Sequence, residues 1–149
     1  DYLDYQHIYE EKYGKKTVVL FEMGTFFEIY GVDNADYQLG NVKELSEILN
    51  IQMTRRNKHI VENSFKNPLM AGVPRHSISK YLQILLAHHY TVVMVIQVHT
   101  EEGIERKVSH VLSPGTQIDY HPGASSNYLM AIYVERNQSF PQIIQIFYF

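Results

Sequence analysis

The sequence predicts an α/β protein with a mixed β-sheet flanked by helices, followed by the first strands of a second α/β domain. Apolar residues recur at helical spacing in three segments, and short β-branched runs lie between and after them. The order strand, helix, strand, helix, strand, strand is typical of a sheet with helices packed on it. A stretch rich in Gly, Pro and Ser then precedes two further apolar segments, which are too few to close a core alone.

The N-terminal part begins with a predicted helix over residues 2–13, where tyrosines recur at helical spacing and Gly14 suits the C-terminal cap. Residues 18–21 are a β-branched, apolar run, which we expect to form a buried strand. A second helix is expected after Asn41, which can cap it with Glu44 as the capping-box partner. The expected inward face of this helix consists of Val42, Leu45, Ile48 and Leu49.

The next segment is predicted to contain a short strand, a loop, a helix and a hairpin. Residues 51–54 are expected to form the strand, and residues 55–69, which are polar and contain Asn, Ser and Pro, the loop. The clearest helix is expected from residue 77 to about residue 89, because its apolar residues follow the i, i+3, i+4, i+7 pattern. The β-branched run over residues 91–98 is typical of a strand covered on both faces, and residues 106–112 are expected to pair back on it.

The composition suggests domain boundaries. We expect a first domain over residues 1–116, a linker over 117–126 and the truncated start of a second domain over 127–149, with strands at 128–134 and 142–149. The chain has no initiator Met and stops within an apolar run, so we expect it to be a fragment of a longer protein.

Composition excludes several classes of protein. The chain is 45% hydrophobic and 19% charged, which is ordinary for a folded protein. No apolar run approaches the ~18 residues that a membrane span needs, and without cysteine neither a disulfide nor a cysteine zinc site is expected. The net charge of −3 is unevenly placed: residues 1–50 hold ten acids and four lysines, and residues 51–149 hold nine Lys and Arg and six acids. A local basic surface is therefore compatible with an acidic chain.

No catalytic or metal site is predicted in the chain. The segment around Gly14-Lys15-Lys16-Thr17 does not fit the phosphate-binding pattern G-x-x-x-x-G-K-[ST]. The eight histidines form no H-x-x-x-H or H-E-x-x-H pair, and no G-x-S-x-G nucleophile elbow occurs.

Residues 26–28 are the strongest candidate for a binding site. Two Phe in a turn after a strand are usually core residues, but alternation in an extended segment sends Phe26 and Glu28 to one side and Phe27 to the other. An exposed Phe can wedge between bases and stack, which is worth about 1–3 kcal/mol. A carboxylate beside it can hydrogen-bond a displaced base edge. On these residues alone, a core role and a nucleic-acid role both remain open.

Several blocks of the sequence resemble the MutS mismatch-repair family, in the same order along the chain. Residues 23–30, MGTFFEIY, are similar to the family segment M-G-D-F-Y-E-L-F and keep its F-x-E motif. Residues 49–56, LNIQMTRR, resemble L-D-I-x-L-T-R-R, and residues 68–76, PLMAGVPRH, resemble P-M-A-G-V-P-Y-H with one inserted residue. Residues 113–116, SPGT, resemble the T-P-G-T that closes the family's N-terminal mismatch-recognition domain. Departures from the family pattern suggest a divergent branch, viral or organellar.

The resemblance implies that the chain recognises mismatched or looped-out bases in duplex DNA. It implies that Phe26 stacks on the mispaired base while Glu28 hydrogen-bonds that base and the duplex kinks, because a mismatch is easier to unstack and bend than paired DNA. We expect Glu28 to bind protonated. Further backbone or groove contacts, each with a structural role as its alternative, are expected from Arg55, Arg56, Met70, Arg75 and His76.

For the full-length protein the resemblance implies a homodimer, an ATPase domain that binds ATP and Mg²⁺ C-terminal to this chain, and a MutL-like partner. It also implies an intracellular, DNA-associated protein with no membrane contact. The fragment itself is expected to have no enzymatic activity and no cofactor. One alternative is a MutS relative that binds DNA junctions or recombination intermediates without mismatch specificity, although such relatives typically lack the pair Phe26 and Glu28. The other is an unrelated small α/β enzyme.

Overall fold

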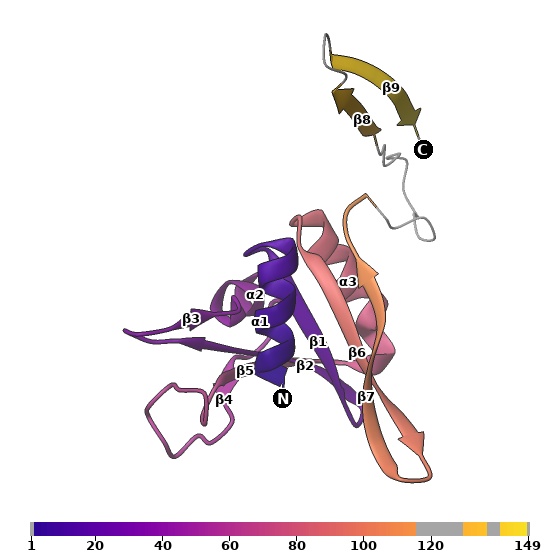
Figure 1. The fold of residues 1–149 in the computed structure, drawn as a ribbon. Helices are drawn as coiled ribbons and strands as arrows, with labels where there is room; N and C mark the ends of the chain where they lie inside the picture. The colour runs from indigo at the N-terminus through magenta and orange to yellow at the C-terminus, as the bar shows by residue number, and fades with distance from the viewer. Residues whose placement is uncertain (1, 116–129, 137–140, 149) are drawn as a thin grey trace. The chain divides into compact units, whose positions relative to one another are not determined.

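The computed structural model describes residues 2–115, 130–136 and 141–148 (Figure 1). The chain divides into two compact units, residues 1–113 and 114–149. The first contains α1 (Tyr2–Tyr13), β1 (Thr17–Met23), β2 (Phe26–Asp33), β3 (Gln38–Leu39), α2 (Val42–Leu49), β4 (Thr54–Arg55), β5 (Leu69–Pro74), the 3₁₀ turn η1 (Arg75–Ser77), α3 (Ile78–Ala87), β6 (Thr91–Thr100) and β7 (Gly103–Leu112).

The second unit contains the two strands expected near the end of the chain, β8 (Met130–Arg136) and β9 (Pro141–Tyr148), which pair antiparallel. The expected linker, residues 117–126, lies outside the described residues, and the domain boundaries stay predictions.

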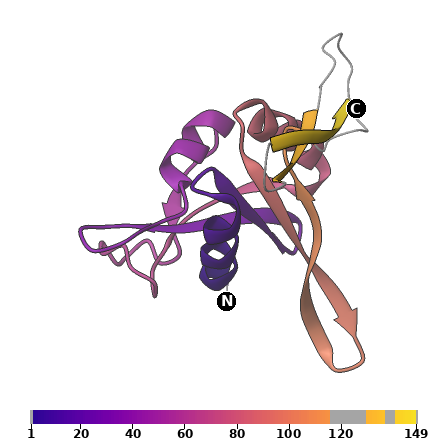
Figure 2. The ribbon, with the colours of Figure 1, turned by 45° about the horizontal axis from the view of Figure 1, so that its top comes forward.

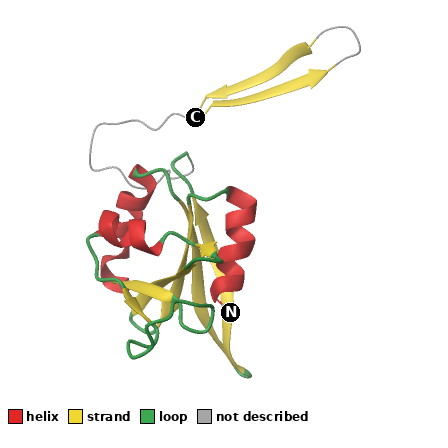
Figure 3. Ribbon diagram, turned by 90° about the vertical axis from the view of Figure 1, so that its left-hand side faces the viewer, coloured by secondary structure: helices red, strands yellow, loops and turns green. Residues whose placement is uncertain are grey.

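The first unit is built on a mixed seven-stranded sheet, and this confirms the expected fold class. The strand order is β4-β5-β2-β1-β6-β7, with β3 added to β2. Only β1 and β6 run parallel, and the other pairs are antiparallel. Helix α1 lies on one face of the sheet, and α2 and α3 lie on the other (Figure 3). The far end of the β6–β7 hairpin projects beyond the rest of this unit (Figure 2).

Each face of the sheet carries its own core. Under α2 and α3, Phe27 and Ile29 of β2 pack in one cluster that also contains Val18 and Leu20 of β1 and Val92 of β6. Under α1, Tyr30 of β2 packs with Leu3, while Val93 and its neighbours pack with the helix tyrosines. The run in β6 is therefore covered on both faces, as its composition predicted.

The prediction of a strand over residues 51–54 is wrong: only Thr54 in this range belongs to a strand, the two-residue β4. Residue Asn50 is left-handed, with φ of 50°, and its N–H donates to the Glu47 carbonyl. The Ile51 N–H donates to the Ser46 carbonyl at 2.9 Å. This is a Schellman arrangement, so Ile51 is the apolar residue that closes α2 over the core and does not begin a strand.

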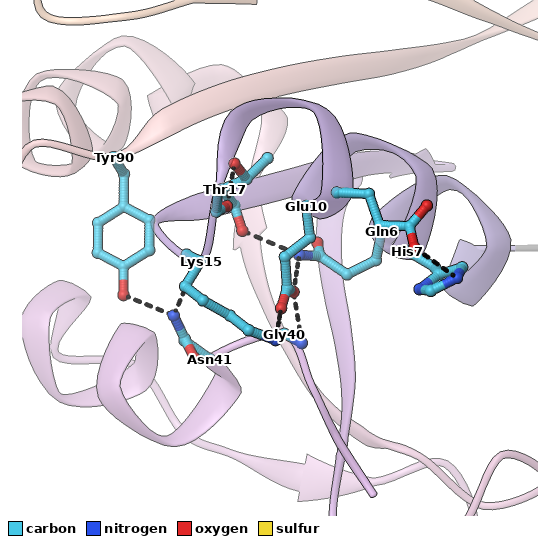
Figure 4. A network of polar contacts seen from close by, with 10 residues as sticks. Gln6, His7, Glu10, Lys15, Thr17, Gly40, Asn41 and Tyr90 are labelled. Carbon is cyan, nitrogen blue, oxygen red and sulfur yellow. Dashed lines mark hydrogen bonds and ion pairs between the residues drawn. The ribbon is translucent and has the colours of Figure 1, made fainter.

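The predicted capping box at Asn41 is also wrong. Asn41 makes no side-chain cap hydrogen bond to α2. Its amide instead donates to the Lys15 carbonyl at 2.9 Å and to the Tyr90 hydroxyl at 3.3 Å (Figure 4). Glu44 lies 3.7 Å from the Lys16 ammonium. Long-range partners just before β1 and β6 thus use both side chains that local reasoning assigns to the cap.

The sequence reading misses strand β2, which lies at the centre of the sheet, and β5, which lies beside it. The sequence predicts no more than an extended segment for residues 26–28, and it predicts a loop that ends at residue 69. In the structure β2 pairs with β5 over six residues, from Phe26 opposite Pro74 to Gly31 opposite Leu69. The glycines and the Pro in these segments weaken their strand signal, and the pairing itself is long-range.

Helix α1 is fastened to the sheet by a buried amide. Strand β2 pairs with β1 only from residue 21 onward, so the first half of β1 lacks a strand neighbour on that side. There the Gln6 amide donates to the Thr17 carbonyl at 2.9 Å, and its oxygen accepts from the Val19 N–H at 3.0 Å. The Glu10 carboxylate in turn accepts from Gln6 and from the Gly40 N–H (Figure 4). These side chains satisfy backbone groups that would otherwise be buried without partners.

We predict that Gly31→Ala destabilises the fold by about 1–3 kcal/mol, the usual cost of overpacking. A Cβ at Gly31 would lie 2.6 Å from the Leu39 carbonyl oxygen and 2.8 Å from Val42 Cγ2. Gly72→Ala is the matched control, because a Cβ there meets its nearest atoms at 3.5 Å, an ordinary contact distance. Urea unfolding measures both variants, and equal losses in the two would contradict the prediction.

We predict that Tyr90→Phe flattens the alkaline loss of stability. Burial, opposed by the Asn41 hydrogen bond and reinforced by Glu44, raises the pKa of Tyr90 from 10.0 to about 12. The unfolded chain then releases this proton near pH 10 while the folded chain keeps it, so the Tyr90 contribution is complete below pH 10 and is lost as the pH rises through 12. The free energy of unfolding, measured in urea between pH 8 and 11.5, should fall less steeply in this variant than in wild type. An exposed-site control, Tyr37→Phe, should keep the wild-type slope.

Candidate functional site

The candidate site lies at the β1–β2 turn. Met23 and Phe26 pair across it, so only Gly24 and Thr25 form the loop. Gly24 has φ of +60° and Thr25 has no positive φ, a pattern typical of a type II′ hairpin. The turn therefore places Phe26 as the first residue of a strand and not in a mobile loop.

Side chains alternate along β2 as the sequence predicts, with Phe26 and Glu28 on one face of the sheet and Phe27 on the other. Phe27 is 4% exposed and belongs to the core under α2 and α3. Phe26 is 44% exposed, and it shares the opposite face of the sheet with the half-buried Glu28. Helix α1 covers part of this face, and Phe26 lies outside the clusters that pack against the helix. A large aromatic ring is thus held in the open on a rigid strand.

Gly72 of β5 leaves room beside both side chains. It lies opposite Glu28 in the ladder, and a Cβ there would meet Glu28 Cγ at 3.5 Å and Phe26 Cδ1 at 3.8 Å. With hydrogen in place of a side chain, this position leaves the flanks of the ring and the carboxylate accessible. Pro74, opposite Phe26, completes the neighbouring strand.

A tyrosine pair orients Glu28. The Tyr30 hydroxyl, two residues along the same face, donates to the Glu28 carboxylate. The Tyr30 ring stacks on Tyr2 of α1, with ring centroids 4.2 Å apart and planes 11° apart. Burial, then the hydrogen bond and charge of Glu28, raise the pKa of Tyr30 well above its ordinary value, so it remains a hydrogen-bond donor at neutral pH. One carboxylate oxygen of Glu28 is thereby engaged, and the other is directed by the same contact.

The turn is anchored by four side chains that we call the Glu22 clasp: Glu22, Arg75, Gln97 and Arg106. Glu22 Oε1 lies 2.8 Å from Arg75 Nη1, and Glu22 Oε2 accepts from the Gln97 N–H at 2.8 Å. Arg106 donates to the Glu22 carbonyl and lies over the Phe21 ring. Gln97 Oε1 also accepts from the Gly24 N–H at 3.4 Å. Four elements, β1, η1, β6 and β7, therefore meet at the base of the turn that carries Phe26.

The five other predicted contact residues do not form one surface with Phe26 and Glu28. Met70 shares their face, but it packs against Tyr30. His76 is exposed in η1, one residue after Arg75, which is paired with Glu22. The remaining two, Arg55 and Arg56, lie at the edge strand and at the start of the following loop.

Arg55 and Arg56 are separated from the turn along the sheet. Arg55 pairs with Leu69, whereas Phe26 pairs with Pro74 at the other end of β5. The Nε of Arg55 is buried and has no hydrogen-bond partner among the described residues. Arg56 is exposed and borders a basic hollow formed by the loop over residues 56–67. These two arginines therefore lie at a different place on the sheet from Arg75.

The loop over residues 56–67 is ordered by the buried Asn67. Its amide donates to the carbonyls of Ile60 and Glu62, at 3.1 and 2.8 Å, and its oxygen accepts from the Asn57 N–H at 2.7 Å. The sequence reading treated this segment as an undifferentiated polar loop. A buried Asn at the end of a loop has no distinguishing sequence signal, because surface loops are rich in the same residue.

The sequence reading also missed the clasp and Tyr30. Alternation would have placed Tyr30 beside Glu28 if β2 had been recognised as a strand. No local signal links Glu22 to Gln97, since 75 residues separate them.

Among the described ranges, no three His, Cys, Asp or Glu side chains are grouped so that they could hold a metal ion. Within the same ranges, no helix has the length and apolar character needed to cross a membrane.

Comparison with known proteins gives one family. The family model described as MutS domain I matches residues 4–121. A mutS homolog of DNA mismatch repair from Acanthamoeba polyphaga mimivirus is 36% identical over 138 residues, covering 92% of this chain and 12% of that protein. The DNA mismatch repair protein MutS of a Streptococcus pneumoniae strain is 32% identical over 139 residues, covering 89% of this chain and 15% of that protein. The chain thus spans about an eighth to a seventh of the length of these relatives.

We predict that the Tyr30 hydroxyl and the Glu28 carboxylate are energetically coupled. Tyr30→Phe keeps the ring on Tyr2, and Glu28→Ala removes the acceptor. The double variant should be more stable than the sum of the single effects implies, with a coupling of about 1 kcal/mol for a hydrogen bond to a charged group near the surface. Urea unfolding of the four proteins measures this term. Additive effects, within about 0.3 kcal/mol, would show that the contact does not orient Glu28.

Proposed function

The chain belongs to the MutS family and carries its domain I, and on this premise we propose that it recognises mispaired or looped-out bases in duplex DNA. The observation that carries the proposal is the position of Phe26. Its ring is largely exposed at the end of a strand whose neighbouring residue, Phe27, is locked in the core. Exposing one of two adjacent Phe residues costs apolar burial, which favours a role in contact with a ligand.

Phe26 is the wedge in this proposal. An aromatic ring inserted beside a base partly unstacks it and kinks the duplex, at a cost of a few kcal/mol per step that is smaller for a mismatch. A flat ring stacks on any base, so Phe26 contributes affinity for deformable DNA and little base identity. The two-residue turn behind the ring restricts its movement when the duplex resists.

Glu28 supplies the base-edge contact. Tyr30 holds one of its oxygens, so the second oxygen is available to a base that leaves the stack beside Phe26. Gly72, opposite Glu28 in the ladder, has no side chain that would block the approach of a flat group to both side chains. We further propose that Glu28 binds DNA protonated and donates to an acceptor on the base, because an ionised carboxylate is repelled by nearby phosphates.

Phosphate or groove contacts are proposed for the other predicted residues at two places. Arg55 and Arg56 lie at the sheet edge beside the basic loop, where cations meet few acids. His76 follows Arg75 in η1, directly after the end of β5 that pairs with Phe26. Met70 shares the face of Phe26 but lies beside Thr54, at the Arg55 end of β5. Contacts of this kind with the DNA backbone fix the register and orientation of the protein on the duplex, but they do not read the base sequence.

The rest of the proposal concerns the protein that contains the chain, and it is supported by family membership alone. We infer that this protein is DNA-associated, acts as a homodimer, binds ATP and Mg²⁺ through residues outside this chain and works with a MutL-like partner. No catalytic role is proposed for residues 1–149.

The test is mismatch binding by the gene product that contains this chain. Phe26→Ala should weaken binding to a mismatched duplex by about 5-fold to 150-fold, the equivalent of a lost stack of about 1–3 kcal/mol, and should change binding to matched duplex little. Phe65→Ala is the matched control, because Phe65 is similarly exposed, at 47%, but lies in the loop over residues 56–67. Fluorescence anisotropy on both duplexes measures the ratio.

Glu28 variants separate the two parts of the proposal. Glu28→Gln keeps a donor and should retain more mismatch affinity than Glu28→Ala. Equal losses would end the idea of a protonated Glu28 but leave the wedge intact. A wild-type protein that binds four-way junctions tightly and mismatched duplex no better than matched duplex would replace the proposed function with junction recognition.

A further inference from the structure

Arg75 has a structural partner that gives it a different role from the phosphate contact expected of it. We propose that Arg75 is a positioning residue, which acts through Glu22 to hold the Phe26 turn rigid and thereby determines discrimination between mismatched and matched DNA. The inference rests on the proposed function, and it identifies a specificity-determining pair, Arg75 and Glu22, behind the wedge.

The geometry links Arg75 to both sides of the turn. Its backbone N–H donates to the Thr25 carbonyl at 2.9 Å, directly before Phe26, and its guanidinium lies 2.8 Å from Glu22 Oε1 on β1. Pro74, the preceding residue, is the ladder partner of Phe26. Arg75, the residue after β5, therefore bridges the two sides of the turn, from Thr25 before β2 to Glu22 of β1.

The charges of Arg75 and Glu22 explain why Arg75 keeps its place in this bridge. The Glu22 side chain is 6% exposed, and Arg75 supplies the only ion pair that the described residues give it, while the Arg75 side chain is 64% exposed. A carboxylate left nearly buried without a counter-charge is unfavourable. A DNA phosphate that competes for Arg75 would leave Glu22 in that state, because Gln97 offers a backbone N–H and Arg106 bonds the Glu22 carbonyl and not its carboxylate.

The bridge that Arg75 forms is needed because the Phe26 wedge must resist a force from the DNA. Unstacking a base step pushes back on the wedge, and a turn that yields would let matched and mismatched DNA accommodate the ring at similar cost. A two-residue turn has few internal contacts, so its rigidity comes from the side chains behind it. A preorganised wedge avoids the loss of conformational freedom on binding and preserves the energetic difference between the two duplexes.

The experiment uses the gene product that contains this chain and the variants Arg75→Gln, Glu22→Gln and their combination. Binding to mismatched and matched duplexes is measured across a salt series. A 2-aminopurine beside the mismatch reports unstacking through its fluorescence at saturating protein. Lys43→Gln is the charge-matched control, since it removes one cation and the Lys43–Asp33 ion pair at the far end of β2. Gly31→Ala controls for general destabilisation away from the turn.

The proposal expects Arg75→Gln to lower the ratio of mismatched to matched affinity by about 5- to 10-fold and to reduce the 2-aminopurine amplitude, as loss of preorganisation requires. The slope of log affinity against log salt should stay at the wild-type value. Glu22→Gln should act in the same direction, and the double variant should be no worse than either single one, because both break one contact. The two controls should keep the wild-type ratio and amplitude.

A phosphate role for Arg75 would give the opposite pattern. Affinity for both duplexes would fall alike, the salt slope would decrease by about 1, and the fluorescence amplitude at saturation would be kept. Glu22→Gln would then strengthen binding to both duplexes by releasing Arg75. Either result overturns the inference about Arg75. The proposed function still stands in that case if the wild-type protein binds mismatched duplex better than matched duplex. A wild-type protein that does not distinguish the two duplexes overturns both proposals. If Arg75→Gln fails to fold, Glu22→Gln alone decides: a lower ratio of mismatched to matched affinity supports the inference, and stronger binding to both duplexes overturns it.

Discussion

The register of β2 is the constraint on which the candidate site depends. This strand is paired on both sides, and its residues Phe27 and Ile29 are buried under α2 and α3. A slip of one residue would expose that apolar set and bury Glu28, so the pairing cannot shift without losing the core. Phe26 and Glu28 project because the residues between and beyond them are committed to the opposite face.

Helix α1 decides how much of the projecting face stays open. The Gln6 amide completes the hydrogen bonding of β1 where β2 has not yet begun to pair, which fixes the helix over the first half of that strand. Tyr2, the first residue of the helix, lies at the border of the covered area. Its ring stacks on Tyr30, which in turn donates a hydrogen bond to Glu28. The same packing that closes the core under α1 therefore orients the carboxylate at its border.

Acidic side chains serve two purposes around the turn. Glu22 is nearly buried and neutralised by Arg75, and it ties together segments that are far apart in the chain. Glu28 is half-buried, accepts a hydrogen bond from a neutral hydroxyl and lies opposite Gly72, which has no side chain to cover it. A paired buried charge gives the turn a fixed geometry, while the second carboxylate keeps a free oxygen for a ligand. The net negative charge of the chain therefore says little about its partner.

The sequence by itself determined the fold class, the long helices, the β6–β7 hairpin, the family and the opposite directions of Phe26 and Phe27. These follow from periodicities of two and 3.6 and from collinear motifs, which are local properties. It failed at residues 51–54, at the Asn41 cap and at strands β2 and β5. In each case a partner distant in sequence determines the conformation: Ile51 closes a helix over the core, Asn41 bonds Lys15 and Tyr90, and β5 supplies the ladder for β2. Only the tertiary structure placed Arg75 on Glu22 and away from Arg55 and Arg56, because a charge shows its partner only once the strands that carry both are aligned.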